Sequence, residues 1–183
     1  MSSERVTIAG FGGQGVMMIG QMLAYAATED NLQTLWFPSY GPETRGGTAN
    51  CSVTISSSEI NSPIFSHADT IIVLNNPSLQ KFSSKVKNNG VVLYNSSLIT
   101  EEVKVEGARV FGVPMNDIAI ELGNARVANM VIMGAYLEIT KVFSQESIVK
   151  VLKKFLEKGK EHLLDINISA LNLGREYILK MEK

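Results

Sequence analysis

Cysteine and histidine are scarce in this sequence, with one Cys and two His in 183 residues. A single thiol cannot form an internal disulfide, and it cannot supply the ligands of an iron–sulfur cluster or a structural zinc site. His67 and His162 stand apart among Ser, Ala and Leu, and we interpret them as a loop residue and a helix residue. The sequence therefore predicts no metal or redox centre held by this chain alone.

Strong net charge and long apolar runs are also missing. The formal charge of -1 argues against a nucleic-acid binder, which usually has a strongly basic surface. Apolar stretches are broken by Gly, Asn or charged residues well short of a membrane span, and the polar stretch 1–5 is unlike a secretory signal. With no domain linker or repeat in view, we expect a single cytoplasmic domain over residues 1–183.

The N-terminal part has the order strand, glycine loop, helix, strand. Arg5–Ala9 is short and rich in β-formers, and it precedes the glycine-rich stretch Gly10–Gly15. Val16–Thr28 is apolar on most sides and too long for a strand, so it predicts a buried helix, and Thr34–Phe37 predicts a second strand. This order is typical of the Rossmann-like opening of a parallel, helix-covered sheet.

The remaining chain continues an α/β pattern and ends in helices. β-rich or apolar runs predict strands at 49–56, 70–75, 90–95 and 109–113, and a helix at 77–87 begins with proline in its first turn. Further helices are expected at 126–143, at 145–157 with Ser144 as N-cap, and from Asn167 or Ser169 to Lys183. We therefore predict a three-layer α/β/α fold with a largely parallel central sheet and a helical C-terminal part.

The glycine loop matches G-x-G-x-x-G through Gly10, Gly12 and Gly15. Glycines let backbone N–H groups approach a phosphate, and a helix N-terminus adds positive potential. A dinucleotide site also needs an acidic residue at the end of the second strand, but that strand ends in aromatic residues and proline. The loop is thus interpreted as binding a phosphate or a partner chain, or as a turn that only permits close strand–helix packing.

A second loop, over residues 39–47, reads SYGPETRGG and follows the second predicted strand. Loops at the carboxyl ends of neighbouring parallel strands flank one crevice, so we expect this loop close to the glycine loop. Arg45 lies between small residues and is suited to gripping a phosphate or carboxylate. Tyr40 can stack on a flat ring, and Glu43 can pair with Arg45, which leaves a purely structural loop as the alternative.

These motifs together resemble the gamma subunit, or gamma domain, of the 2-oxoacid:ferredoxin oxidoreductases. The resemblance runs from GFGGQG through SYGPETRGGTANCSVTIS and SPIFSHADTIIVLNNPSLQKF to RVANMVIMG at 126–134, so it covers nearly the whole chain. The form SYGPETRGG is most similar to the 2-oxoglutarate branch. The pyruvate, branched-chain and indolepyruvate branches share the domain and remain open.

The resemblance implies a subunit that is inactive alone. In that family a 2-oxoacid is oxidatively decarboxylated to an acyl-CoA, with electrons passed to ferredoxin. Thiamine diphosphate, Mg²⁺ and the iron–sulfur clusters would be held by partners, namely alpha and beta subunits and a ferredoxin-like delta subunit. This chain would pack on the thiamine subunits. It would contact coenzyme A, or the thiamine subunit beside it, through the residues carried over from its two loops: Gly12, Gly13, Gln14, Gly15, Tyr40, Glu43, Arg45, Gly46 and Gly47.

Two other functions are weighed against this one. A stand-alone Rossmann-type nucleotide-binding protein would fit the glycine loop, although the ribose-binding acid is missing. A scaffold that binds no ligand would fit the absence of any catalytic constellation.

Cys51 lies inside a predicted strand and is interpreted as a buried small apolar residue, with a reactive thiol as the less favoured alternative. The sequence does not determine the 2-oxoacid, the direction of the reaction or the stoichiometry.

Overall fold

The computed structural model describes residues 3–39, 48–156 and 159–181. Its centre is a six-stranded sheet in the order β2-β3-β1-β4-β5-β6. The pairs β1–β4, β4–β5 and β5–β6 are parallel, and β2–β3 and β3–β1 are antiparallel. The strands are β1 Ser3–Gly10, β2 Gln33–Ser39, β3 Ala49–Ser56, β4 Ala68–Val73, β5 Val86–Asn95 and β6 Arg109–Val113.

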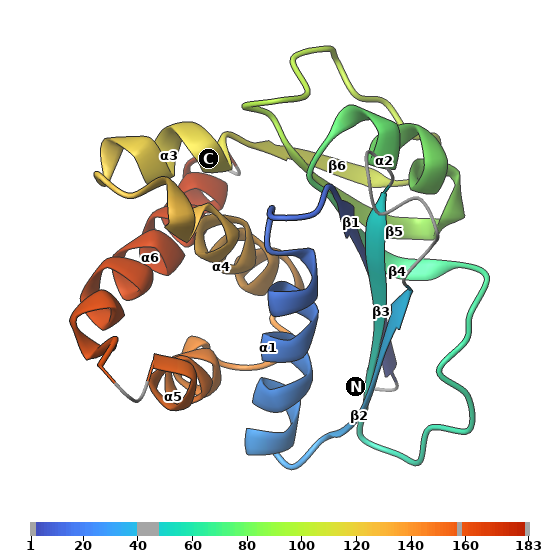
Figure 1. Ribbon diagram of the computed structural model, residues 1–183. Helices are drawn as coiled ribbons and strands as arrows, with labels where there is room; N and C mark the ends of the chain where they lie inside the picture. Colours follow the sequence, from blue (N-terminus) through green and yellow to red (C-terminus); the bar gives the residue numbers. More distant parts are fainter. Residues whose placement is uncertain (1–2, 40–47, 157–158, 182–183) are drawn as a thin grey trace.

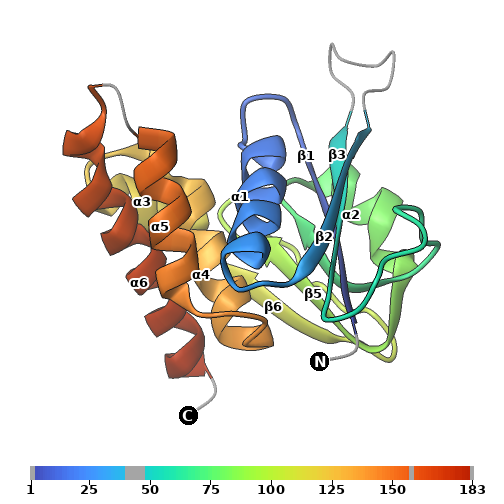
Figure 2. The same ribbon diagram turned by 90° about the horizontal axis from the view of Figure 1, so that it is seen from below.

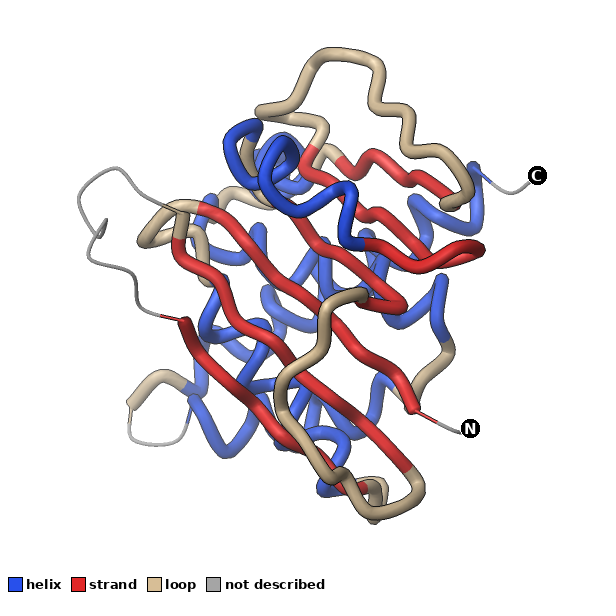
Figure 3. Tube along the Cα trace, turned by 90° about the vertical axis from the view of Figure 1, so that its right-hand side faces the viewer, coloured by secondary structure: helices blue, strands red, loops and turns tan. Residues whose placement is uncertain are grey.

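The helices divide unequally between the two faces of the sheet (Figure 1). α2 and a long loop cover one face, and α1, α3, α4, α5 and α6 lie on the other (Figure 1, Figure 3). Figure 2 shows α5 and α6 farther from the sheet than α1 and α4, so this side is two helices deep. The helices are α1 Val16–Glu29, α2 Asn76–Phe82, α3 Met115–Glu121, α4 Ala128–Thr140, α5 Gln145–Leu156 and α6 Leu164–Met181, with short 3-10 turns at Ser83–Lys85, Ala125–Val127 and Glu161–Leu163.

The α/β/α class, the largely parallel sheet and the helical C-terminal part are confirmed, but the opening differs from a Rossmann unit. β2 does not lie beside β1, because β3 is inserted between them and runs antiparallel to both. Only residues 40–48 separate β2 from β3, and a parallel neighbour needs a crossover of roughly a dozen residues or more. The chain therefore forms a hairpin where we expected continued parallel winding.

Helix boundaries differ from the prediction at several places. The helix expected at 77–87 ends at Phe82 and is followed by a 3-10 turn and then β5. α3 was not predicted, because its seven residues are too few to establish a helical period. The helix predicted at 126–143 is the 3-10 turn plus α4, and it ends where Lys141 adopts a left-handed conformation with φ of 51°. α6 starts before Asn167.

α4 is the central helix of the core. Its residues 128–138 are all buried within this chain. It contacts α1 and β5 on one side and α6 on the other. The crossing with α6 depends on two glycines, because a Cβ on Gly134 would lie 2.0 Å from the Leu171 carbonyl oxygen and one on Gly174 would lie 1.8 Å from that of Val131. The two backbones are therefore in direct contact.

Candidate functional site

The glycine loop connects the end of β1 to the start of α1. Gly13 and Gly15 have φ of 92° and 85°, a region that side chains other than glycine rarely adopt. Gly15 also lies against Asn129 of α4. Gly12 is different, because a Cβ there would meet nothing within 4 Å and its φ is not positive. The fold therefore explains Gly13 and Gly15 but gives no steric reason for glycine at position 12.

Gln14 uses its side chain inside the protein. Its Oε1 accepts hydrogen bonds from the Phe11 amide at 2.6 Å and from Asn75 Nδ2 at 3.0 Å, and its Nε2 donates to the Leu74 carbonyl at 3.3 Å. Gly10 leaves room for this amide, because a Cβ there would lie 2.7 Å from Oε1. Gln14 thus anchors the loop to the end of β4.

The second predicted loop falls on residues 40–47, which lie outside the described residues, so Tyr40, Glu43, Arg45, Gly46 and Gly47 remain sequence predictions. The strand ends that flank it are described. Ser39 pairs with Asn50, and Asn50 pairs with Ala9 at the end of β1. β2 therefore ends, and β3 begins, beside the carboxyl end of β1, where the glycine loop starts.

A cavity of about 270 Å³ lies at the carboxyl ends of the parallel strands. Residues of the glycine loop line one side of it, and residues at the starts of α3 and α4 line the other. We call this cavity the crevice. Its lining residues are Gly13, Gln14, Gly15, Met18, Met115, Asn116, Ala125, Arg126, Ala128 and Asn129. Ligands of open α/β sheets bind outside the carboxyl ends of the strands, and the crevice has that position.

The crevice favours an anion. Arg126 is exposed and is the one charged residue among those that line it. α1 starts at the crevice, and its N-cap Gly15 provides no side-chain cap for the first N–H groups, which leaves their positive potential available. Asn124 accepts from the Arg126 amide at 3.0 Å and so starts the turn that presents Arg126. The remaining surface, with Met18 and Met115, is apolar.

Sequence reasoning missed this second wall. Arg126 and Asn129 stand in RVANMVIMG, which was interpreted as part of a helix and of the family resemblance but not as part of a site. The signal that marks them is two polar residues interrupting the start of an otherwise apolar helix. Asn116 had no comparable signal, because its position depends on the end of β6 reaching the same edge as β1.

Cys51 lies in β3 with its side chain in the core. It is fully buried, and its Sγ is 3.5 Å from the Val16 carbonyl oxygen. Burial raises the pKa of the Cys51 thiol to about 12, so it stays protonated at neutral pH. The interpretation of Cys51 as a buried, small apolar residue is confirmed, since a reactive cysteine needs an accessible thiolate.

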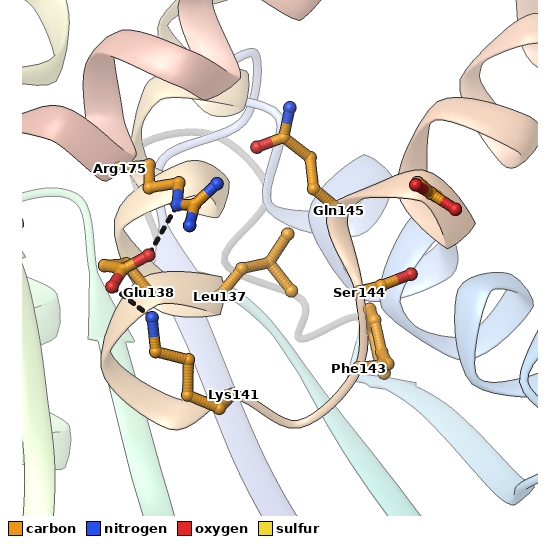
Figure 4. A pocket seen from close by; sticks show the side chains of 8 residues that line it. Leu137, Glu138, Lys141, Phe143, Ser144, Gln145 and Arg175 are labelled. Carbon is orange, nitrogen blue, oxygen red and sulfur yellow. Dashed lines mark hydrogen bonds and ion pairs between the residues drawn. The ribbon is translucent and has the colours of Figure 1, made fainter.

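A larger cavity, of about 440 Å³, lies between α4, α5 and α6 (Figure 4). Three of its charged groups are paired with each other, because Glu138 accepts from both Lys141 and Arg175. Burial alone would raise the pKa of Glu138, but the two cations outweigh it and lower that pKa. Gln145 is likewise bonded to Asn172 of α6. These contacts hold the helices together near the C-terminal end of α4, whereas the crevice lies at its start.

A third cavity, of about 280 Å³, is polar and lies at the amino ends of the parallel strands, opposite the crevice. It is lined in part by Glu4 and Asp69. Burial raises the pKa of Glu4 to about 7; the Thr70 hydroxyl, which donates to it at 2.7 Å, opposes that shift, and Asp69 adds to it. Lys87 pairs with Asp69 at 2.6 Å. The described residues hold no group of three or more His, Cys, Asp or Glu side chains that could bind a metal ion.

Comparison with known proteins identifies the family. Residues 5–177 match the family described as pyruvate ferredoxin/flavodoxin oxidoreductase. The chain belongs to this family. The ketoisovalerate oxidoreductase subunit VorA of Methanothermobacter thermautotrophicus is 40% identical over 94% of the chain, which covers 36% of that protein. The 2-oxoglutarate synthase subunit KorC of Methanothermobacter marburgensis is 33% identical and is covered almost end to end, with 98% of this chain matching 99% of it.

Solved structures agree with this assignment. The gamma subunit of a keto/oxoacid ferredoxin oxidoreductase from Geobacter sulfurreducens superposes with a TM-score of 0.83 at 29% identity, covering 97% of this chain and 99% of that one. The 2-oxoglutarate:ferredoxin oxidoreductase from Magnetococcus marinus gives 0.89 at 25% identity, but this chain spans only 32% of it. The chain thus spans about a third of some relatives and the full length of others. Within the described part of the chain, no helix is long and apolar enough to span a bilayer.

Proposed function

We propose that this chain is the gamma subunit of a multi-subunit 2-oxoacid:ferredoxin oxidoreductase, in which it packs on the thiamine subunits and lines the coenzyme A side. The observation that carries the proposal is the match to the Geobacter gamma subunit, which covers 97% of this chain and 99% of that one. Thiamine diphosphate, Mg²⁺ and the iron–sulfur clusters would belong to alpha, beta and ferredoxin-like delta subunits.

The crevice supplies the chemistry for the coenzyme A contact. Coenzyme A carries phosphates, and the crevice combines Arg126, the uncapped start of α1 and no carboxylate among its lining residues. Its methionines offer apolar surface to the rest of the ligand. Arg45, predicted on the sequence to grip an anion, would join from residues 40–47. This chain would bind and orient coenzyme A while the partners carry out decarboxylation and electron transfer.

The 2-oxoacid is proposed only as a class. The form of residues 39–47 favoured 2-oxoglutarate, yet identity is 40% to a ketoisovalerate relative and 33% to a 2-oxoglutarate relative. These identities do not single out 2-oxoglutarate. The purified complex should therefore be assayed with 2-ketoisovalerate, 2-oxoglutarate and pyruvate side by side.

Purification from its native cells tests the assignment. The tagged chain should co-purify under anaerobic conditions with subunits that contain thiamine diphosphate and iron–sulfur clusters, and the complex should reduce ferredoxin with a 2-oxoacid and coenzyme A. Elution of the chain without such partners would contradict the proposal.

Two arginines provide a matched test of the coenzyme A contact. Arg126→Ala in the complex should raise the apparent KM for coenzyme A by about tenfold or more, as expected for loss of one charge-assisted hydrogen bond. Arg109 is equally an exposed arginine, but it lies at the opposite edge, so Arg109→Ala should leave that KM unchanged. Equal values for the two variants would exclude the crevice as the contact.

A further inference from the structure

Asn95, at the end of β5, has a side-chain orientation that the backbone determines. The residue is fully buried. Its Oδ1 accepts from the Ser97 amide at 3.2 Å, and its Nδ2 donates to the Leu74 carbonyl at 3.2 Å. A backbone N–H can only donate and a carbonyl can only accept, so the amide of Asn95 cannot be reversed without losing both bonds.

That orientation determines how Asn116 faces the crevice. Asn95 Nδ2 also donates to Asn116 Oδ1 at 2.7 Å. Because Oδ1 of Asn116 is the atom held, its Nδ2 is directed away from Asn95. Asn116 lines the crevice, and no described residue accepts a hydrogen bond from its Nδ2. Nδ2, a donor, is therefore the amide atom of Asn116 that is left for an occupant of the crevice, since Oδ1 already accepts from Asn95.

The same carbonyl connects this wall to the glycine loop. The Leu74 carbonyl accepts from Gln14 Nε2 as well as from Asn95 Nδ2. Gln14 in turn holds the Phe11 amide of the glycine loop at 2.6 Å. The Leu74 carbonyl oxygen, just after β4, thus holds Gln14 of the glycine loop and also Asn95, which in turn holds Asn116.

We propose that Asn95 is a positioning residue that keeps Asn116 Nδ2 aimed into the crevice as a hydrogen-bond donor to an acceptor oxygen of the bound ligand, while the shared Leu74 carbonyl holds the glycine loop opposite. The ligand class is a phosphate-bearing molecule, which complements the neighbouring Arg126. The inference rests on the proposed function insofar as that ligand is coenzyme A. It adds two residues, Asn95 and Asn116, to those that the sequence indicated.

A double-mutant cycle in the assembled complex tests whether Asn95 acts through Asn116. Asn116→Ala should raise the apparent KM for coenzyme A about tenfold, the usual scale for one hydrogen bond to a charged group, with kcat and the KM for the 2-oxoacid unchanged. Asn95→Ala should raise it similarly. The double variant should be no worse than Asn116→Ala alone. An unchanged KM in Asn116→Ala, or fold-changes that multiply in the double variant, would overturn the proposal.

A second variant keeps the test decisive if Asn95→Ala fails to assemble. Asn116→Asp keeps the oxygen that accepts from Asn95 but replaces the donor with a carboxylate oxygen. It should raise the coenzyme A KM more than Asn116→Ala does, because a like charge then faces the phosphate. Wild-type affinity in Asn116→Asp would refute the proposed donor.

The control is Asn167→Ala. Asn167 is also a buried amide, and it donates to the Leu163 carbonyl at 2.7 Å in α6, away from the crevice. The Asn167→Ala variant should assemble and keep the wild-type KM for coenzyme A. A raised KM in this variant would attribute the effects to general loosening of the fold and contradict the inference. A wild-type complex without coenzyme A-dependent turnover would instead be a failure of the proposed function, which separates the two outcomes.

Discussion

The glycine loop and the α4–α6 crossing both depend on glycine, but for different reasons. At the crossing, Gly134 and Gly174 bring two backbones into contact, and any side chain would collide with a carbonyl oxygen. In the loop, Gly12 has open space around it and an unstrained φ. A glycine that the fold requires is evidence about stability. One that the fold does not require is better explained by a ligand or partner that approaches the backbone.

The largest effect is expected at the crossing. Gly174→Ala would place a methyl group 1.8 Å from the Val131 carbonyl oxygen, so α4 and α6 must move apart and the buried contacts around them must loosen. We expect a loss of roughly 3 kcal/mol or more in the free energy of unfolding, at the upper end for overpacking. Urea denaturation of the isolated chain measures it. A loss below about 1 kcal/mol would show that the helices separate easily, and would break the comparison.

An intermediate effect on stability is expected from Glu4, which lies at the amino ends of the parallel strands, opposite the crevice. Its pKa is raised from 4.5 to about 7, because burial disfavours the carboxylate. The folded state therefore favours the protonated form. The stabilisation is complete below the unfolded pKa, is lost as the pH rises through about 7, and amounts to at most about 3 kcal/mol.

Glu4→Gln should remove this pH dependence, as followed by urea denaturation between pH 4 and 9. Glu146→Gln, at an exposed position, is the control and should retain the wild-type profile. The apparent KM for coenzyme A should be unaffected by Glu4→Gln in the complex. Such a result would sharpen the distinction between a polar cluster that serves folding and one that serves binding. Identical pH profiles for wild type and Glu4→Gln would contradict the assigned shift.

The smallest effect on stability is expected at Gly12. Gly12→Ala adds a methyl group into open space, so the free energy of unfolding should change by less than about 0.5 kcal/mol, as for other surface substitutions. In the complex the same variant should raise the apparent KM for coenzyme A or weaken subunit association. It is also the matched control for Gly174→Ala, because the chemical change is identical. A variant that is both stable and fully active would remove the functional explanation for this glycine.

Local patterns predicted most of the elements of this fold. β6 was predicted with the bounds it has, Arg109–Val113, because a short apolar run between polar segments has few alternatives. α1 was predicted from its length and apolar content. The neighbour of β2 was not predicted correctly, since strand order depends on how the chain closes after residue 39. α3 was not predicted, because its seven residues are too few to establish a helical repeat of apolar residues.

The candidate site was predicted in part. The glycine loop was placed correctly between β1 and α1, and Gly15 was found at the start of the helix. The contact of Gln14 with coenzyme A stays a prediction, and the sequence did not indicate that its amide is bonded to Phe11, Leu74 and Asn75. A side chain's partners lie far along the sequence, so a motif can identify the residue without indicating the direction of its hydrogen bonds.

By itself, the sequence determined the family, the α/β class and the position of the glycine loop, because these follow from local composition and from motifs that occur in order along the chain. Tertiary structure alone decided which glycines the fold requires and which wall faces the glycine loop. It also left Nδ2 of Asn116, and not its Oδ1, without a hydrogen-bond partner among the described residues. That result depends on the Leu74 carbonyl and the Ser97 amide converging on Asn95. Hydrogen-bond direction is set by the three-dimensional arrangement of backbone groups, which no local pattern encodes.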